Sequence, residues 1–186
     1  MSLVFLDTPP DTAYEYVIDW LDHPSGRLPL DEFLNMETSV YEFADAPTLR
    51  LLAPTPTTVS CCRQGNFNYD LDEGESVLLA DNRDSIFPVH VHFDTPVSEV
   101  GAYVSADAAT GRDYKREIAV LLEGQTQWQS FTLSAPLTKQ RGTAAFLGVR
   151  ANGGSRIAEI GFDVMNVPGV PAKVRRVAIG PLFVTP

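Results

Sequence analysis

Two histidines separated by one residue, His90 and His92, form the pair most suggestive of chemistry in this sequence. Residues i and i+2 of a β-strand project from the same face, so the two imidazoles could share a metal ion. A zinc or iron site needs at least three ligands. Asp94 continues the same face, but the three side chains would spread over about 13 Å along a flat strand. We therefore favour the simpler interpretation, polar residues on the exposed face of a half-buried strand.

Acidic residues alternate around Gly74, where Asp70, Asp72 and Glu75 lie in a turn-rich segment. Carboxylate oxygens in such a turn are the ligands that calcium prefers. The segment is shorter than a full calcium-binding loop. The sequence therefore predicts either a structural calcium ion at these three residues or, as we favour, a solvated acidic turn.

Trp128 is the aromatic residue best suited to contact a ligand. If Phe131 and Leu133 point into the core, strand alternation turns Trp128 to the opposite face. An indole between Gln127 and Gln129 is typical of a sugar-binding surface, because the ring stacks on the apolar side of a pyranose. A bulge of one residue would instead turn the indole inward.

Tyr103 is a second aromatic candidate, since it is out of phase with the apolar residues around it. Together, the predicted ligand-contacting residues are Trp128, Tyr103, His90, His92, Gln127 and Gln129.

Motifs for catalysis are absent from the sequence. It has no Gly-x-Ser-x-Gly elbow, no phosphate-binding glycine loop and no His-Glu-x-x-His. The adjacent Cys61 and Cys62 are too close in sequence to favour a mutual disulfide, and we expect small core thiols in a strand. We therefore predict no catalytic residue.

The elements that must position these residues are mostly strands. In residues 87–94 the apolar side chains fall on one face and the histidines on the other, which is the period of a strand with one buried face. Short strands with turn signals about every 8–12 residues indicate an antiparallel sandwich or barrel. The predicted strands are residues 48–53, 57–62, 76–80, 87–94, 97–105, 117–123, 127–134, 143–150, 156–164 and 173–184.

Residues 11–22 allow two interpretations. Thr12 and Glu15 have the spacing of a capping box, and the apolar residues that follow fall on one helical face. A strand is the alternative, with Tyr14, Tyr16, Ile18 and Trp20 in alternation. We favour a short helix.

Length and charge limit the class of protein. The 186 residues fit a single domain, with residues 1–35 as an N-terminal extension carrying the helix and residues 36–186 as the sandwich. A net charge of −10 argues against binding to nucleic acid and against binding to anionic membrane surfaces. The chain has no apolar run of about 20 residues that could span a bilayer. No leader is visible, so an exported protein would have lost it already, and the oligomeric state is open.

The strand sequences after Gly74 resemble a jelly-roll β-sandwich of the kind found in bacterial exported proteins with the PEP-CTERM sorting signal and, more distantly, in carbohydrate-binding modules. The segments that carry the resemblance are residues 74–78, 92–101, 146–149, 157, 160–162 and 177–182. Gly180 departs from it, since such domains often have an aspartate there.

The resemblance implies a jelly-roll fold, is compatible with a structural calcium ion, and names no reaction. We therefore expect a non-catalytic binding module for a carbohydrate or another extracellular ligand on an exposed strand face. Two alternatives stay open: a sugar-active hydrolase or lyase on the same scaffold, and a structural subunit of an assembly.

Overall fold

The chain forms strands arranged in two sheets, and every pairing between the strands is antiparallel. The computed structural model describes residues 2–10, 13–20, 33–34, 39–41, 48–51, 59–63, 70–81, 87–108, 110–138, 140–166 and 174–186. These ranges contain no helix, and so none that could cross a membrane. The prediction of a mostly β, antiparallel fold is confirmed.

Sheet A has nine strands in the part of the chain that the structure describes. Its main path runs in the order β1 (Ser2–Leu6), β12 (Ala145–Asn152), β9 (Glu99–Asp107), β14 (Arg176–Ile179), β7 (Ser76–Asp81), β6 (Val59–Arg63) and β3 (Phe33–Leu34). Off this path, β15 (Leu182–Thr185) pairs with β9 and with β2 (Tyr16–Ile18).

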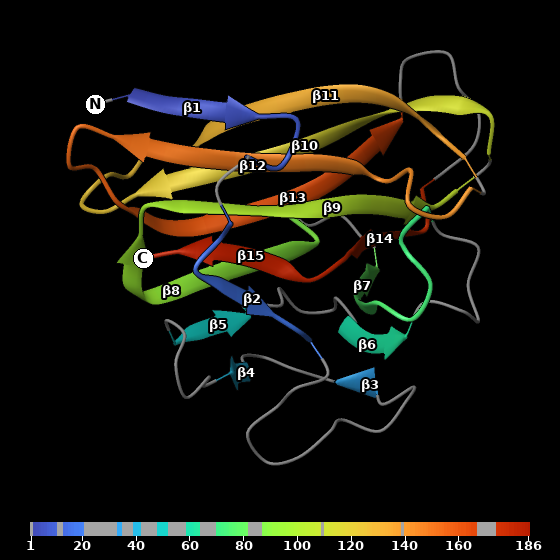
Figure 1. Ribbon diagram of the computed structural model, residues 1–186, viewed down its shortest axis with the longest axis horizontal. Coiled ribbons are helices and arrows are strands. Elements are labelled where there is room, and N and C mark those ends of the chain that lie inside the picture. The colour runs from blue at the N-terminus through green and yellow to red at the C-terminus, as the bar shows by residue number, and fades with distance from the viewer. Residues whose placement is uncertain are drawn as a thin grey trace.

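Among the described residues, sheet B has six strands. They run in the order β11 (Gln129–Leu137), β10 (Arg112–Leu122), β13 (Ile157–Asn166), β8 (Val89–Val97), β5 (Leu49–Leu51) and β4 (Ser39–Tyr41). Figure 1 shows the two sheets as layers, with β12 and β9 of sheet A in front of β10 and β13 of sheet B.

One hydrophobic core lies between the sheets, and strand alternation selects its members. On β8, Val89, Val91 and Phe93 are buried, whereas His90 and His92 point outward and are partly exposed. The same alternation buries the inward side chains of β9 and β10, as the sequence predicts. Inward residues of both sheets join a single apolar cluster, which fixes the opposite face of each strand as the outer one.

The predicted N-terminal helix is wrong, and the alternative interpretation holds for the described part. Residues 13–20 contain the strand β2, which pairs with β15, so Val17 lies opposite Phe183. Ile18 and Trp20 are fully buried, and the Trp20 indole Nε1 donates a hydrogen bond to the Gly180 carbonyl at 2.7 Å. Pairing and burial of these side chains outweigh the local helix signals. Thr12 lies outside the described residues.

Several strands also differ from the sequence prediction, and three of them show why. β1 was not expected, although it pairs along its whole length with β12. β8 continues through Thr95 and Pro96 to Val97. The expected last strand is two strands, β14 and β15, because the chain breaks at Gly180 and Pro181.

Candidate functional site

A row of polar side chains crosses the outer face of sheet B at β13 and β8. Glu159 of β13 lies opposite His92 of β8 in the strand register. Its carboxylate reaches both histidines: Oε2 is 2.7 Å from His90 Nε2, and Oε1 is 3.4 Å from His92 Nδ1. One carboxylate thus links the two imidazoles.

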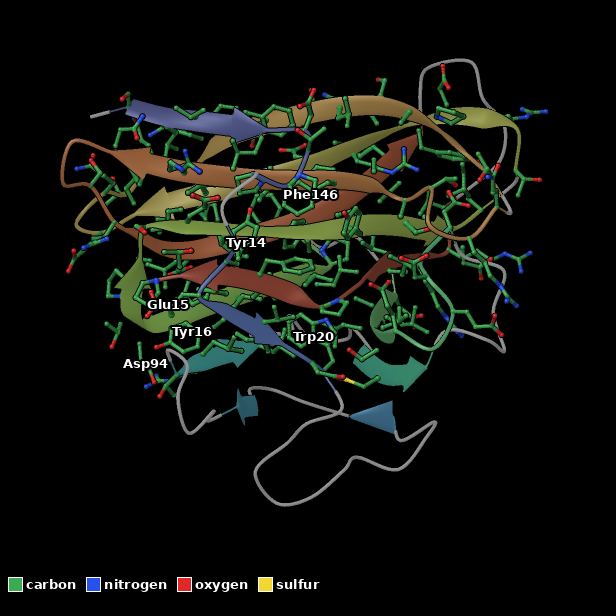
Figure 2. All side chains as sticks on the ribbon, in the orientation of Figure 1. Tyr14, Glu15, Tyr16, Trp20, Asp94 and Phe146 are labelled. Atoms are coloured by element: carbon green, nitrogen blue, oxygen red, sulfur yellow. The ribbon has the colours of Figure 1, made fainter. Side chains whose placement is uncertain are left out.

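The row continues onto β5. Arg50 lies opposite His92 on the other side of β8, and its Nη2 is 2.8 Å from Asp94 Oδ1. The same oxygen is 3.7 Å from His92 Nε2. Figure 2 labels Asp94 at the margin of the molecule, beside β5 and β8. We call His90, Glu159, His92, Asp94 and Arg50 the polar row.

Solvent reaches every member of the polar row. The exposed fraction of the side chains rises from 22% at Glu159 to 46% at Arg50. Hydrogen-bond donors and acceptors therefore stand at the surface in a fixed order, which is what recognition of a polar ligand requires.

Two aromatic rings, those of Phe87 and Trp128, adjoin the His90 end of the polar row. The Trp128 ring centroid is 4.9 Å from that of Phe87 and 5.4 Å from that of His90, which it meets edge-on at 75°. Trp128 is partly exposed. It lies on the outer face, whereas Phe131 and Leu133 pack against the core, as the strand period predicts. We call Phe87 and Trp128 the aromatic pair.

Small residues beneath the aromatic pair make room for it. Gly161 of β13 lies between His90 on β8 and Ala119 on β10. A β-carbon on Gly161 would overlap the Phe87 ring. The absence of a side chain at this position therefore lets the Phe87 ring lie close to the sheet, beside Trp128.

Gln127 and Gln129 are exposed on either side of Trp128 in the sequence. Gln129 lies opposite Val120, which points inward, so this amide is on the other face from the indole. Gln127 lies before the start of β11, next to Trp128 in the sequence.

The Asp70 carboxylate is buried and contacts Thr138 and Arg116. Its carboxylate accepts hydrogen bonds from the backbone N–H of Thr138 at 3.0 Å and from the Thr138 hydroxyl at 3.3 Å. Arg116 Nη2 is 4.0 Å away, and both side chains are fully buried. Burial raises the pKa of Asp70, which Thr138 and Arg116 oppose. The carboxylate is thus held beside a cation already supplied by the chain.

Asp72, Glu75 and Tyr103 meet at a small cavity on the outer side of sheet A. Its volume is about 50 Å³, and its lining residues are Asp70, Leu71, Asp72, Glu75, Tyr103, Gly142 and Ala144. The Asp72 backbone N–H donates to Glu75 Oε2 at 3.1 Å. Burial, with Asp72 as a like charge, raises the pKa of Glu75. Burial also raises the pKa of Tyr103, with smaller contributions from Glu75 and Asp72.

The acidic turn does not present a set of calcium ligands as it stands. Within the described ranges, no group of three or more His, Cys, Asp or Glu side chains is arranged to hold a metal ion. Asp70 lies 4.0 Å from Arg116 Nη2. The calcium ion at Asp70, Asp72 and Glu75 stays a prediction, as does a metal on the histidine pair.

Tyr103 also borders an aromatic cluster on the outer face of sheet A. Its ring centroid is 5.3 Å from that of Phe146 and 6.1 Å from that of Phe183. The Tyr14 ring centroid is 5.4 Å from that of Phe183, and Figure 2 shows Tyr14 beside Phe146 in front of β9 and β12. Tyr103 is therefore far more enclosed by neighbouring rings than the sequence suggested.

Glu159, Phe87 and Arg50 are the members of the site that the sequence analysis missed. Glu159 stands far from the histidines in sequence and reaches them only through the pairing of β13 with β8. The outward phase of Glu159 between the buried Ile157 and Ile160 is obscured by a register shift at that point. Strand pairing is the information that a single sequence lacks.

Comparison with known proteins found no family that matches the chain: no protein-family model matches it, and no curated protein matches it either.

Proposed function

We propose that the chain is a non-catalytic binding module that takes a hydroxylated ligand, of the carbohydrate class, on the outer face of sheet B. The observation that carries the proposal is the contact between the aromatic pair and the polar row at His90, 5.4 Å from Trp128 and 2.7 Å from Glu159. A partly exposed ring beside carboxylate and imidazole groups suits a sugar, which has an apolar face and a rim of hydroxyls.

The order of the strands supports a jelly-roll fold for this module. Sheet A contains β7, β14, β9 and β12 in that order, and sheet B contains β8, β13, β10 and β11. The chain thus passes from one sheet to the other in the sequence expected of two Greek keys wrapped together. We propose this fold, and with it the kinship to exported PEP-CTERM-type proteins and carbohydrate-binding modules.

A thermal-shift screen against neutral and acidic oligosaccharides, followed by calorimetric titration, tests the proposed function. A ligand that binds the folded state raises the unfolding midpoint. Trp128→Ala removes the stacking ring, and Glu159→Gln removes the shared carboxylate charge with little change of shape. We expect each to weaken binding by about tenfold or more, since each removes about 1.5 kcal/mol of contact.

Glu123→Gln is the matched control for Glu159→Gln, because Glu123 is exposed in the turn after β10. It should leave the affinity unchanged. Equal affinity in the wild type, Trp128→Ala and Glu159→Gln would show that the ligand binds elsewhere.

A second candidate function is a sugar-active hydrolase or lyase, and the cavity at Glu75 is the observation that favours it. Acid groups with raised pKa values in a cavity are typical of catalytic sites. Glu75 and Tyr103 are such a pair. Turnover of an oligosaccharide that Glu75→Gln abolishes while Glu159→Gln leaves it intact would establish this candidate in place of the first.

A further inference from the structure

We infer that the chain forms a homodimer in which β11, the edge strand of sheet B, pairs antiparallel with β11 of a second copy. Among the described strands, β11 pairs only with β10. Half of its backbone N–H and C=O groups therefore point away from the sheet, where no described strand meets them. Such a row of groups is a template for another strand.

The length and regularity of β11 separate it from the other edges. It has nine residues, whereas β1 has five, β4 has three and β3 has two. Its pairing with β10 runs from Arg112 opposite Leu137 to Val120 opposite Gln129 without a bulge. Proteins protect exposed edges by shortness, bulges, prolines or charges. Apart from Pro136 near its end, β11 has none of these.

The absence of charge on β11 suits another copy of this chain as the occupant. The chain carries a net charge of −10, so two copies repel each other over most of their surface. Residues 125–138 carry no charged side chain. The outer face of β11 presents the small hydroxyl residues Ser130, Thr132 and Ser134, all exposed. At β11 two copies can approach side by side without charged side chains of the paired strands meeting.

β1, the edge strand of sheet A next to β11, also lacks charged side chains. The Phe5 ring of β1 stacks on Phe131 of β11, with centroids 5.6 Å apart and planes within 4°. Both edges therefore lie on one side of the molecule, the upper side in Figure 1. Val4 of β1 is 40% exposed. A partner that pairs with β11 would bring a second β1 and a second Val4 to this side.

An antiparallel pair of identical strands is closed by a two-fold axis, so both copies use the same surface and no further copy is recruited. Pairing over Gln129–Ala135 leaves Pro136, which has no N–H, outside the new ladder. A two-fold axis perpendicular to the sheet keeps both outer faces on the same side. If the proposed function holds, the two Trp128 rings then face one direction and can bind a repeating ligand together.

Sedimentation equilibrium and light scattering of the full chain over a range of concentrations test the dimer. We expect a species of twice 20.4 kDa that dissociates on dilution. Thr132→Lys places one lysine of each copy near the centre of the paired strands, and we expect it to raise the dissociation constant about fivefold or more. Thr95→Lys makes the same exchange at an exposed position of β8, away from the edge, and should leave the dimer unchanged.

Hydrogen exchange of the wild-type β11 amides provides a second measurement that does not depend on folding of the lysine variant. The outward N–H groups of β11, alternate residues along the strand, should become protected as concentration rises. A monomer at every concentration would overturn the proposal. A dimer that Thr132→Lys leaves intact, with outward amides that exchange freely, would overturn it too. Loss of the dimer with retained affinity for a single ligand would leave the proposed function untouched.

Discussion

The Phe87 ring lies against Gly161 of β13, where an added β-carbon would collide with the ring. This contact holds Phe87 against Trp128, with ring centroids 4.9 Å apart. The geometry of the proposed ligand surface thus depends on a residue that itself offers no functional group.

Gly161→Ala tests this dependence. The added methyl group must displace the Phe87 ring and, through it, Trp128. We expect ligand affinity to fall about tenfold or more, and acrylamide quenching of Trp128 fluorescence to rise. Gly101→Ala is the matched control, because a β-carbon there would overlap Phe146 on sheet A. The control should lower the unfolding midpoint as well, but it should not change affinity or Trp128 quenching. If both variants bind equally well, the aromatic pair does not form the ligand surface.

Substitutions in the buried pair of Arg116 and Asp70 should lower stability strongly, and the effects of the two substitutions should not add. Arg116 Nη1 donates to the Ala135 carbonyl at 2.7 Å, and its Nε donates to the Val104 carbonyl at 3.0 Å. Arg116→Met removes these bonds and leaves the Asp70 carboxylate buried without its cation. We expect a loss of about 3–5 kcal/mol in the free energy of unfolding.

Urea denaturation of a double-mutant cycle measures that coupling. Asp70→Asn removes the charge that Arg116→Met leaves unpaired, so the double variant should lose less than the sum of the two single losses. Strict additivity would mean that the two charges do not stabilise each other across 4.0 Å.

Replacing Asp163 by asparagine should stabilise the protein by an amount that depends on pH. Burial, and to a smaller degree the like charge of Glu117 opposite it, raises the pKa of Asp163 to about 6. The folded state therefore holds a proton that the unfolded state has already lost between about pH 4 and 6, and stability falls as pH rises through that window. Asp163→Asn removes the penalty and keeps an acceptor for the Val164 N–H.

We expect Asp163→Asn to raise the free energy of unfolding at pH 7 by about 1–2 kcal/mol, allowing for solvent at this partly exposed side chain. The gain should shrink below pH 6 and vanish near pH 4. Denaturant unfolding at several pH values measures it. A gain that is the same at pH 4 and pH 7 would contradict the assignment to this carboxyl group.

The sequence alone predicted the alternation of the strands well, because burial follows period two wherever one face meets the core. Strand β8 is such a case: its side chains Val91 and Phe93 point inward, whereas His90 and His92 point outward. The prediction of a helix at residues 11–22 is wrong because the apolar residues there suit a strand as well. The pairing of β2 with β15, from the far end of the chain, decides in favour of the strand.

The candidate site could be predicted only in part, for the same physical reason. Trp128 and His90 carry recognisable side chains, but their contact depends on strand pairing that no local pattern encodes. Asp70 is a predicted calcium ligand, and its neighbour Arg116, which the sequence did not reveal, comes from β10. Long-range pairing supplies the partners, whereas local sequence supplies only the types of side chain.

The two indole N–H signals of the chain provide the most direct test of the central claim, that Trp128 contacts the ligand. Trp20 is fully buried and donates to the Gly180 carbonyl, whereas Trp128 is partly exposed on the outer face of sheet B. A nitrogen–proton correlation spectrum is recorded during titration with an oligosaccharide that raises the unfolding midpoint. We predict a saturable shift of the Trp128 indole signal while the Trp20 signal stays in place. A bound oligosaccharide that leaves the Trp128 signal unmoved would contradict the account.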